Sequence, residues 1–579
     1  MADQSPKNID NLRHSTAHLL AAAVMELWPK TKRAIGPSIK DGFYYDFDFG
    51  SSKISENDFP KIEKKMRKLL PTWKKFEKKL LSAKEAKGEY LKNPYKHELI
   101  DEFSDNGKKK ISFYKSGNYA DLCRGGHVDN PAKDLKHFKL LSVAGAYWRG
   151  NEKNKMLTRI YGTAWPTKDE LDKYLWQLEE AKKRDHRKLG QKLELFRFEN
   201  IAPGAPFWYP NGMIIIKELE KLWRNVHEQN GYQEISTPIM TKSEVFKTSG
   251  HFEHYEHNMF NMEIEDEQYS LKPMNCPEST YVYASTTRSY KDLPLRFSEI
   301  GRLHRREKSG ELGGLFRVRQ ITMDDAHIYT SVDKMSQEIQ SVIDLVKHFY
   351  GIFDFKPKFY LSTRPQKYMG DKKLWDQAEI RLSQALKTKK IKYQKKPGEG
   401  AFYGPKIDVD IKDSIGRSWQ LATIQLDFQM PNRFKLKYID KDGLEREPIM
   451  IHRAIFGSFE RFIGILIEHF AGAFPLWLSP VQVIIIPIGE NHHLYAQKVA
   501  DSLTKANVRA QVDSSSLSMQ KRIRNAEIQK TPYILIVGDR EAKSDLVNLR
   551  TRGKKETTNV TVKKLIQKLA DEIESKTIM

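Results

Sequence analysis

Cysteine is scarce in this sequence, with Cys123 and Cys276 the two examples among 579 residues. Two cysteines so far apart exclude a disulfide framework and indicate a reducing compartment, so we expect a cytoplasmic protein. The N-terminus, MADQSPKNIDNLRHSTAHLL, lacks the basic segment and apolar core of a signal peptide. No apolar run approaches the roughly 20 residues that cross a bilayer, so we expect no membrane partner.

Acidic residues are outnumbered by basic ones. Lys and Arg total 98 against 75 Asp and Glu, which gives a formal net charge of +23. Such an excess favours a polyanionic partner, most commonly nucleic acid. The alternative is an ordinary solvated basic surface, and charge alone does not separate the two.

The length requires several domains, because a chain of 579 residues is too long for one hydrophobic core. Four parts follow one another, each with its own pattern of predicted elements: an α+β region, a polar connector helix, an α+β region dominated by antiparallel strands, and a β-α-β-α-β pattern typical of a doubly wound α/β sheet. Within the first part, the pattern predicts helices over 12–28 and 57–87. The four parts span residues 1–165, 166–195, 196–475 and 476–579.

Three segments of the third part have the features of a phosphate site. The first is a helix and strand that run into Pro238. The second, RLHRREKSGELGGLFRVR, is predicted as two strands around a Gly-rich loop, with Arg317 and Arg319 in the later strand. The third, IHRAIFGSFERF, places Arg461 near the start of a helix. Arginines at the ends of regular elements suit bidentate clamping of phosphate, although each taken singly is more often solvated or ion-paired.

A cluster of cysteine and histidine is encoded in the first part. The segment YADLCRGGHV places His127 four residues after Cys123, and HSTAH places His14 and His18 at the same interval. On a helix this interval puts two side chains on one face. The residue types fit half of a metal site, a catalytic thiol, or a buried cysteine beside a turn, and they leave these alternatives open.

In order and at these separations, the three segments resemble motifs 1, 2 and 3 of class II aminoacyl-tRNA synthetases. With HSTAH, DLCRGGHV, KPMNCPE, DDAHIY and HRAIFGSFERF, the chain resembles the threonyl-tRNA synthetases over essentially its whole length. The resemblance implies an N-terminal α+β editing domain, a class II catalytic core built on an antiparallel sheet, and a C-terminal doubly wound α/β anticodon-binding domain.

The resemblance implies a ligase that uses ATP to form threonyl-adenylate and then transfers threonine to tRNA(Thr). Arg305 would hold the α-phosphate and the threonine carboxylate, and Glu307 would help to hold adenine. Arg317 and Arg461 would contact the phosphates, with Mg²⁺ accompanying ATP; these three arginines are the implied catalytic residues. The implied threonine pocket comprises Met274, Asp325, Tyr403, Gln420 and Ser458, and Gln420 also belongs to the ATP site.

The same resemblance assigns one zinc ion per subunit to Cys276, His327 and His452, which no spacing rule would join. Three protein ligands leave coordination positions open for the amino group and hydroxyl of threonine. A site that pairs with a hydroxyl rejects valine, which lacks it, and Asp325 would accept the hydroxyl's hydrogen bond.

Serine presents a different problem, because it lacks one methyl group relative to threonine, worth only about 1–3 kcal/mol. A second site that hydrolyses seryl-tRNA(Thr) is therefore expected. The resemblance assigns this editing role, without metal, to His14, His18, Asp121, Cys123 and His127, and zinc at this cluster is the alternative.

Further implications concern partners and departures from the family. Glu541 and Arg550 would read anticodon bases, with plain surface charge as the alternative, and motif 1 would form a homodimer. Arg306 stands where Asn is usual, and Met323 where Gln is usual. The chain begins almost at the editing domain, without the small ubiquitin-like domain of many members, so we expect the core reaction to survive with altered tRNA contacts.

Two other functions compete with this interpretation. One is a synthetase-like RNA-binding regulator that no longer charges tRNA, and the other is a related class II synthetase for serine, proline or histidine. The intact arginines of motifs 2 and 3 and the three implied zinc ligands argue against the regulator.

Overall fold

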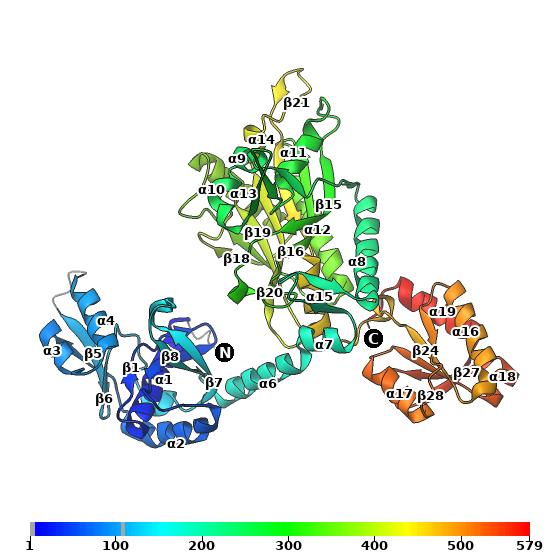
Figure 1. Ribbon diagram of the computed structural model, residues 1–579. Coiled ribbons are helices and arrows are strands. Elements are labelled where there is room, and N and C mark those ends of the chain that lie inside the picture. Colours follow the sequence, from blue (N-terminus) through cyan, green and yellow to red (C-terminus); the bar gives the residue numbers. More distant parts are fainter. Residues whose placement is uncertain (1–5, 106–109, 579) are drawn as a thin grey trace. The chain divides into compact units, whose positions relative to one another are not determined.

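The computed structural model describes residues 6–105 and 110–578 (Figure 1). The chain forms two compact units whose boundary lies between Glu179 and Glu180, within helix α6 (Lys168–Arg184). Within the described residues, no helix combines the length and the apolar character that a membrane crossing requires.

The first unit contains two antiparallel sheets. The larger has the strand order β1-β3-β8-β7 with β2 paired to β3, and the smaller has the order β4-β5-β6. Its strands are β1 (Lys32–Arg33), β2 (Ser38–Ile39), β3 (Gly42–Asp48), β4 (Glu77–Leu81), β5 (Ile111–Ser116), β6 (Tyr119–Leu122), β7 (Phe138–Tyr147) and β8 (Met156–Ala164). Its helices before α6 are α1 (Pro6–Leu27), α2 (Phe59–Leu69), α3 (Ala83–Gly88), α4 (Pro94–Asp105) and α5 (Pro131–Asp134).

Helix α1 is the core element of this unit. Its Ala- and Leu-rich stretch is fully buried against the larger sheet, and α2 packs beside it. The single helix predicted over 57–87 is wrong, because the stretch contains α2, strand β4 and α3. Strand β4 is almost wholly exposed and Lys-rich, so no local sequence pattern predicts it. Only its pairing with β5 defines it as a strand.

The second unit is built on an eight-stranded, mainly antiparallel sheet with the order β11-β15-β16-β23-β20-β19-β17-β18. The strands are β11 (Gln233–Glu234), β15 (Leu295–His304), β16 (Gln320–Thr330), β17 (Lys358–Ser362), β18 (Tyr393–Lys396), β19 (Lys406–Lys412), β20 (Ser418–Asp427) and β23 (Ile449–Ala454). Smaller sheets use β9 (Phe196–Phe198), β10 (Pro206–Trp208), β12 (Met240–Lys242), β13 (Phe260–Ile264), β14 (Glu267–Leu271), β21 (Tyr438–Ile439) and β22 (Glu445–Arg446).

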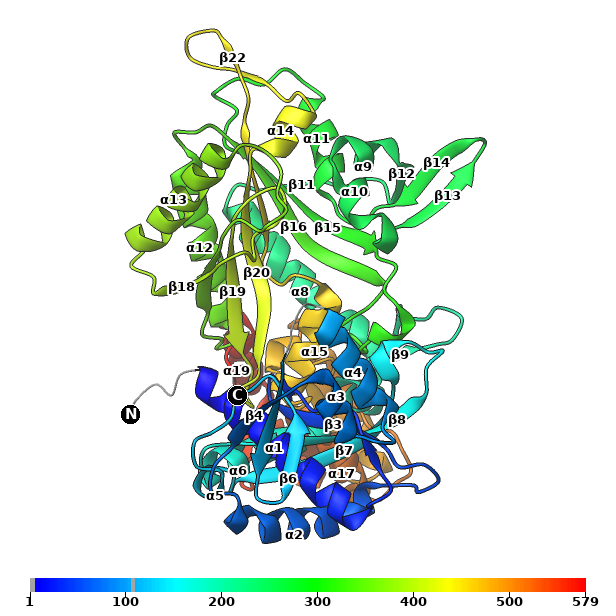
Figure 2. The same cartoon turned by 90° about the vertical axis from the view of Figure 1, so that its left-hand side faces the viewer.

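Helices cover this sheet and close its core. They are α7 (His186–Lys192), α8 (Pro210–Gln229), α9 (Glu244–Thr248), α10 (His251–Tyr255), α11 (Cys276–Ala284), α12 (Met335–Ile352), α13 (Lys372–Thr388), α14 (Gln429–Arg433) and α15 (Phe459–His469). Figure 2 shows α12 and α13 along one side of the sheet, and α9 and α10 beside the β13–β14 hairpin. The predicted connector helix is two helices, α6 and α7, because Asp185 leaves helical geometry and caps α7 through its carboxylate.

The C-terminal part of the second unit has its own sheet with the order β25-β24-β26-β27-β28. Its elements are β24 (Val483–Pro487), α16 (His493–Lys505), β25 (Ala510–Val512), α17 (Met519–Ile528), β26 (Tyr533–Val537), α18 (Asp539–Ser544), β27 (Leu546–Thr551), β28 (Thr557–Thr561) and α19 (Val562–Glu574). The β-α-β-α-β pattern gives three parallel strands as predicted. It missed β27 and β28, which pair antiparallel and make the sheet mixed.

A buried carboxylate joins the sheet of the second unit to the turn before α15. Asp324 of β16 accepts hydrogen bonds from the Trp223 indole (2.6 Å) and from the Arg453 guanidinium (2.9 Å). Its second oxygen accepts the backbone N–H groups of Ile455 (2.9 Å) and Phe456 (2.7 Å). The side chains of Asp324 and Arg453 are both 0% exposed, so each charge depends on the other.

We expect Asp324→Ala to lower the free energy of unfolding by about 3–5 kcal/mol, because it leaves the Arg453 guanidinium buried without its counter-charge. Denaturant titration followed by circular dichroism measures this. The control is Asp376→Ala, which breaks an exposed ion pair with Arg364 and should cost less than about 1 kcal/mol. Equal midpoints for the two variants would contradict the structural role of Asp324.

Candidate active site and a second histidine-rich cavity

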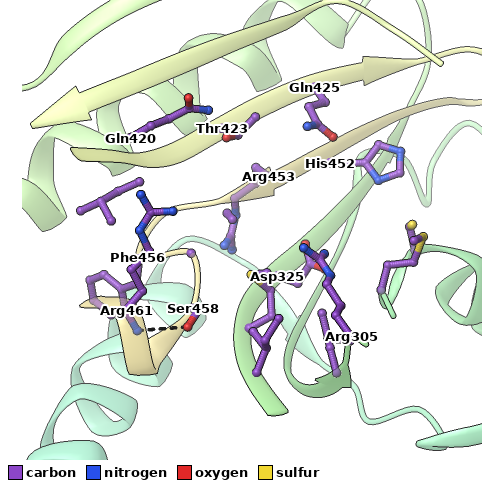
Figure 3. Close-up of a pocket in the computed structure, with 18 of the residues that line it drawn as sticks. Arg305, Asp325, Gln420, Thr423, Gln425, His452, Arg453, Phe456, Ser458 and Arg461 are labelled. Atoms are coloured by element: carbon purple, nitrogen blue, oxygen red, sulfur yellow. Dashed lines mark hydrogen bonds between the residues drawn. The ribbon is translucent and has the colours of Figure 1, made fainter. Parts of the chain in front are cut away.

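A cavity of about 660 Å³ lies over the sheet of the second unit. In Figure 3 the labelled side chains of Arg305, Asp325, His452 and Arg461 converge on it from separate elements. The structure brings together every residue predicted for catalysis, ATP, threonine and zinc: Met274, Cys276, Arg305, Glu307, Arg317, Asp325, His327, Tyr403, Gln420, His452, Ser458 and Arg461.

The loop between β15 and β16 supplies the first two arginines. Arg305 follows the end of β15, and its Nε donates to the carbonyl of Pro273 (3.1 Å). Arg317 forms ion pairs with Glu307 (2.7 Å) and Glu311 (2.9 Å). Arg317 and Arg319 lie in the loop and not in a strand as predicted, because β16 begins only at Gln320.

The third arginine lies in the first turn of α15. Ser458 is the N-cap of this helix, and its Oγ accepts the backbone N–H of Arg461 (3.1 Å; Figure 3). Burial lowers the pKa of the Arg461 guanidinium, an effect that the Asp410 charge opposes. A helix N-terminus together with a cation favours an anion in front of it.

A thiol and two imidazoles lie at one end of this cavity. Ligand atoms of Cys276, His327 and His452 lie within 4.8 Å of one another, and all three residues are buried. The register of β16 and β23 places His327 opposite His452, and Cys276 begins α11. The Nε2 of His452 lies 3.0 Å from a carboxylate oxygen of Asp427, so Nδ1 of the same ring is left as the ligand atom.

The electrostatics of this trio are those of a cation site. Burial raises the pKa of the Cys276 thiol well above its usual value, and the Asp325 charge raises it further. Burial and the neighbouring His452 lower the pKa of His327 well below its usual value. Burial also raises the pKa of Asp325 to about 6. A thiol, two buried imidazoles and nearby carboxylates match the donors that zinc prefers.

The sequence analysis missed several residues of this cavity. His251 lines it, and burial together with His452 lowers the pKa of His251 to about 3, so its imidazole is neutral near pH 7. Thr423, Gln425 and Arg453 also line the cavity. Their strands could be predicted, but which alternate side chains face a cavity depends on the pairing of the strands.

Two predicted pocket residues have their polar groups already engaged. The Gln420 amide donates to Asp408 (2.8 Å), and the Tyr403 hydroxyl donates to Gln425. Met323, at the position where the family usually has Gln, also lines the cavity, whereas the backbone N–H of Arg306 donates to Asn258.

The first unit contains a second cavity, of about 550 Å³, lined by His14, His18, Asp121 and Cys123 among others. The Cys123 sulfur lies 2.9 Å from Nε2 of His14 and 3.4 Å from Nε2 of His127. The His127 ring stacks on Phe76 with centroids 3.8 Å apart. The predicted cluster is therefore a contiguous group, with ligand atoms of its three histidines and Cys123 within 4.8 Å of one another.

Asp121 differs from the others, because its carboxylate is fully buried and saturated with partners. It accepts hydrogen bonds from the hydroxyls of Tyr45, Tyr90 (2.5 Å) and Tyr119 (3.0 Å) and pairs with Lys96 (2.8 Å). Burial alone would raise the pKa of Asp121, but Lys96 and Arg33 bring it well below its usual value. Lys96, which is 2% exposed and lines the cavity, was missed because a lone lysine in a helix gives no sequence signal.

Burial makes the histidine–cysteine cluster neutral. It lowers the pKa of His14, lowers that of His18 well below its usual value, and with His14 lowers that of His127 to about 3. Burial also raises the pKa of Cys123 to about 11. At neutral pH the cluster is a set of uncharged donors and acceptors and contains no thiolate nucleophile.

The two residues predicted to read the anticodon lie in the C-terminal part. A carboxylate oxygen of Glu541 accepts the backbone N–H of Gly538 (2.9 Å) at the start of α18. Arg550, on β27, pairs with Glu527 (2.9 Å). Both are partly exposed, and their role in RNA recognition stays a prediction.

Three family models match this chain. Residues 260–470 match the tRNA synthetase class II core domain (G, H, P, S and T), residues 482–572 an anticodon binding domain, and residues 111–161 the threonyl and alanyl tRNA synthetase second additional domain. The matches cover the C-terminal sheet, most of the first cavity and part of the second cavity, while His251 and Tyr255 of the first cavity lie before residue 260.

Curated and solved proteins resemble the chain over most of its length. It is 49% identical to a threonine–tRNA ligase of Thermotoga maritima over 99% of this chain and 89% of the relative. It is 51% identical to that of Caldanaerobacter subterraneus over 98% and 87%. A crystal structure titled as the RNA binding domain of threonyl-tRNA synthetase from Cryptosporidium parvum matches 67% of this chain and 98% of that chain, with 38% identity and a TM-score of 0.65.

The raised pKa of Cys123 predicts an unusual pH profile for its alkylation. In the native protein, the iodoacetamide reaction of Cys123 should still rise about tenfold per pH unit between pH 8 and 10, since the thiolate fraction is still increasing. In the urea-unfolded chain the rate should reach half its maximum near pH 8.5 and level off above about pH 9.5. Peptide mass spectrometry measures both, and a native profile that levels off at the same pH as the unfolded chain would contradict the neutral thiol.

Proposed function

Because this chain belongs to the threonyl-tRNA synthetase family, we propose that its first cavity is the site where threonine and ATP react. The chain is a threonine–tRNA ligase: it activates L-threonine with ATP, transfers it to tRNA(Thr) and carries the domain that edits the mischarged product. The observation that supports the assignment of the site is the convergence of Arg305 and Arg461 with Cys276, His327 and His452 in one cavity.

The arginines position ATP for attack by the threonine carboxylate on the α-phosphorus, with pyrophosphate as the leaving group. Arg305 holds the α-phosphate and the carboxylate, while Arg317 and Arg461 hold the other phosphates, whose charge Mg²⁺ shares. An incoming phosphate competes with Glu307 for Arg317, which frees the Glu307 carboxylate for the base. Little covalent chemistry is asked of the protein, because positioning and charge neutralisation carry the step.

Zinc fits the group of Cys276, His327 and His452, because their donor atoms are of the types it prefers and the Asp427 carboxylate orients His452. When bound, the ion would supply open coordination positions for the amino group and hydroxyl of threonine. The Asp325 carboxylate lies in the same cavity and accepts a hydrogen bond from that hydroxyl. Valine would leave these buried polar groups unpaired, which is the physical basis for its rejection.

The second cavity hydrolyses seryl-tRNA(Thr). His14 and His127 each hydrogen-bond to Cys123, His14 also contacts the carbonyl of Gly36, and the His18 ring packs against both other imidazoles. All four residues are neutral, so they can orient a water at the ester without a metal. Asp121 holds Lys96 at the wall of the cavity, where an ammonium group suits the phosphates of the RNA end.

The remaining proposals concern assembly and location. Motif 1 forms a homodimer interface, in keeping with the exposed apolar side chains of Ile239 and Met240 directly after its strand. Glu541 and Arg550 contact the anticodon. Cytoplasmic location agrees with the two free cysteines.

The zinc site predicts the behaviour of Cys276→Ala. We expect this variant to lose the one zinc ion per chain that elemental analysis should find in the wild type, and threonine-dependent ATP–pyrophosphate exchange should fall by at least about 100-fold because a metal ligand is gone. Hydrolysis of seryl-tRNA(Thr) should be unchanged. Full zinc content in the variant would refute the assignment, and wild-type exchange that prefers another amino acid would refute threonine activation.

The reciprocal variant, Cys123→Ala, tests the editing site with the same substitution. Zinc content and threonine activation should be those of the wild type, while deacylation of seryl-tRNA(Thr) should slow by about 10–100-fold because the water is no longer oriented. Undiminished deacylation would show that the cluster does not edit. Loss of a second zinc ion from the protein would instead favour the metal alternative at this cluster.

A further inference from the structure

A buried histidine begins the second helix of the connector. His186 is the first residue of α7, in the basic stretch KKRDHRK. It is 2% exposed, whereas Arg187 and Lys188 beside it are exposed. No site described above uses this histidine.

Both ring nitrogens of His186 are engaged in one defined arrangement. Its Nε2 accepts the backbone N–H of Leu315 (3.0 Å), and a backbone N–H can only donate. The proton of the neutral ring is therefore on Nδ1, which donates to Glu468 of α15 (2.7 Å); the backbone N–H of His186 donates to the same oxygen (3.0 Å). With both nitrogens occupied, the cluster of Asp185, His186 and Glu468 has no imidazole lone pair left for a metal.

Leu315 belongs to the loop that carries two residues of the first cavity, Phe316 and Arg317. The Phe316 ring lies 4.1 Å from the His186 ring and 4.5 Å from that of Trp419, so it is held on two sides. The preceding Gly314 has a φ of +60°, and a Cβ there would lie 2.4 Å from Nε2 of His186. The loop therefore approaches the histidine as closely as a backbone can.

The other side of His186 leads to the third arginine of the cavity. Glu468 forms an ion pair with Arg417 (2.6 Å), whose Nε donates to Asp413 (2.7 Å). Asp413 also accepts the indole N–H of Trp419 (2.9 Å). The guanidinium of Arg461 lies over the Trp419 ring, 5.8 Å from its centroid. Hydrogen bonds, ion pairs and one cation–ring contact thus join His186 to both sides of the proposed phosphate-binding cavity.

We propose that His186 is a positioning residue for ATP: its Nε2 fixes the backbone at Leu315, and this contact holds Phe316 and Arg317 in the cavity. The proposal rests on the assignment of that cavity to ATP. His186 contacts none of the predicted threonine or zinc residues in the described structure, so its loss should affect ATP and leave threonine binding unchanged.

Two substitutions separate the two ring nitrogens. In His186→Gln, the amide oxygen can take the place of Nε2 and accept from Leu315, and in His186→Asn the amide nitrogen can replace Nδ1 alone. We expect His186→Asn to raise the KM for ATP in the exchange assay by roughly 10-fold, because the buried N–H of Leu315 loses its acceptor. His186→Gln should stay within about threefold of the wild type, and the KM for threonine should change in neither.

Lys188→Gln, an exposed change on the same helix, is the matched control and should have no effect. Gly314→Ala attacks the same contact from the loop, so it should also raise the KM for ATP, and its effect should not add to that of His186→Asn. An unchanged KM for ATP in His186→Asn would overturn the proposal. So would an equal rise in both KM values with a lowered melting temperature, which marks a merely structural role. A wild-type chain without threonine-dependent exchange would instead refute the proposed function of the cavity itself.

Discussion

The buried charge of Asp324 is the constraint on which the geometry of the first cavity depends. A carboxylate at 0% exposure needs partners for both oxygens, and it finds them in Arg453 and in the backbone of the turn at 455–456. That turn leads into Ser458 and α15, so the position of Arg461 follows from the position of Asp324. Successive side chains of a strand point to opposite faces, so Asp325 and His327 lie on the face opposite to Asp324 and line the cavity.

The two cysteines show how the surroundings decide the chemistry of one residue type. Burial raises the pKa of both thiols. Cys276 lies near carboxylates and beside the imidazoles of His327 and His452, and the ligand atoms of the three residues are close enough to bind one cation together. Cys123 exchanges hydrogen bonds with His14 and with the backbone N–H of Gly125, and is satisfied as a neutral thiol. The close Cys–His spacing in the sequence marked Cys123, and four potential metal donors do meet there, but carboxylates lie beside the three donors at Cys276 and favour a cation at that site.

Much of the fold could be predicted from local pattern. The two strands predicted around the Gly-rich loop correspond to β15 and β16, although the later one begins only at Gln320, and the helix predicted before Pro238 is α8. Strand β4 and the pair β27–β28 were missed, since β4 carries no apolar alternation and that of β27 is limited to Val547 and Leu549. The motif arginines were found through the family resemblance. His251, Lys96 and His186 were missed, because a single polar residue that becomes buried leaves no trace in the sequence.

The sequence by itself determined the family, the order of the domains and the motif residues of the two sites, whereas His251, Arg453 and Lys96 were found only in the structure. The family, the domain order and the motif residues can be identified from the sequence, because a motif is a short run of residues with fixed spacing. Only the tertiary structure decided which side chains meet: the register of β16 against β23 sets His327 opposite His452, and the break at Asp185 brings His186 to the loop at Leu315. The physical reason is that a one-residue shift in strand register would turn His327 or His452 to the opposite face of the sheet. Both this register and the contact of His186 with Leu315 are made between segments distant in the sequence.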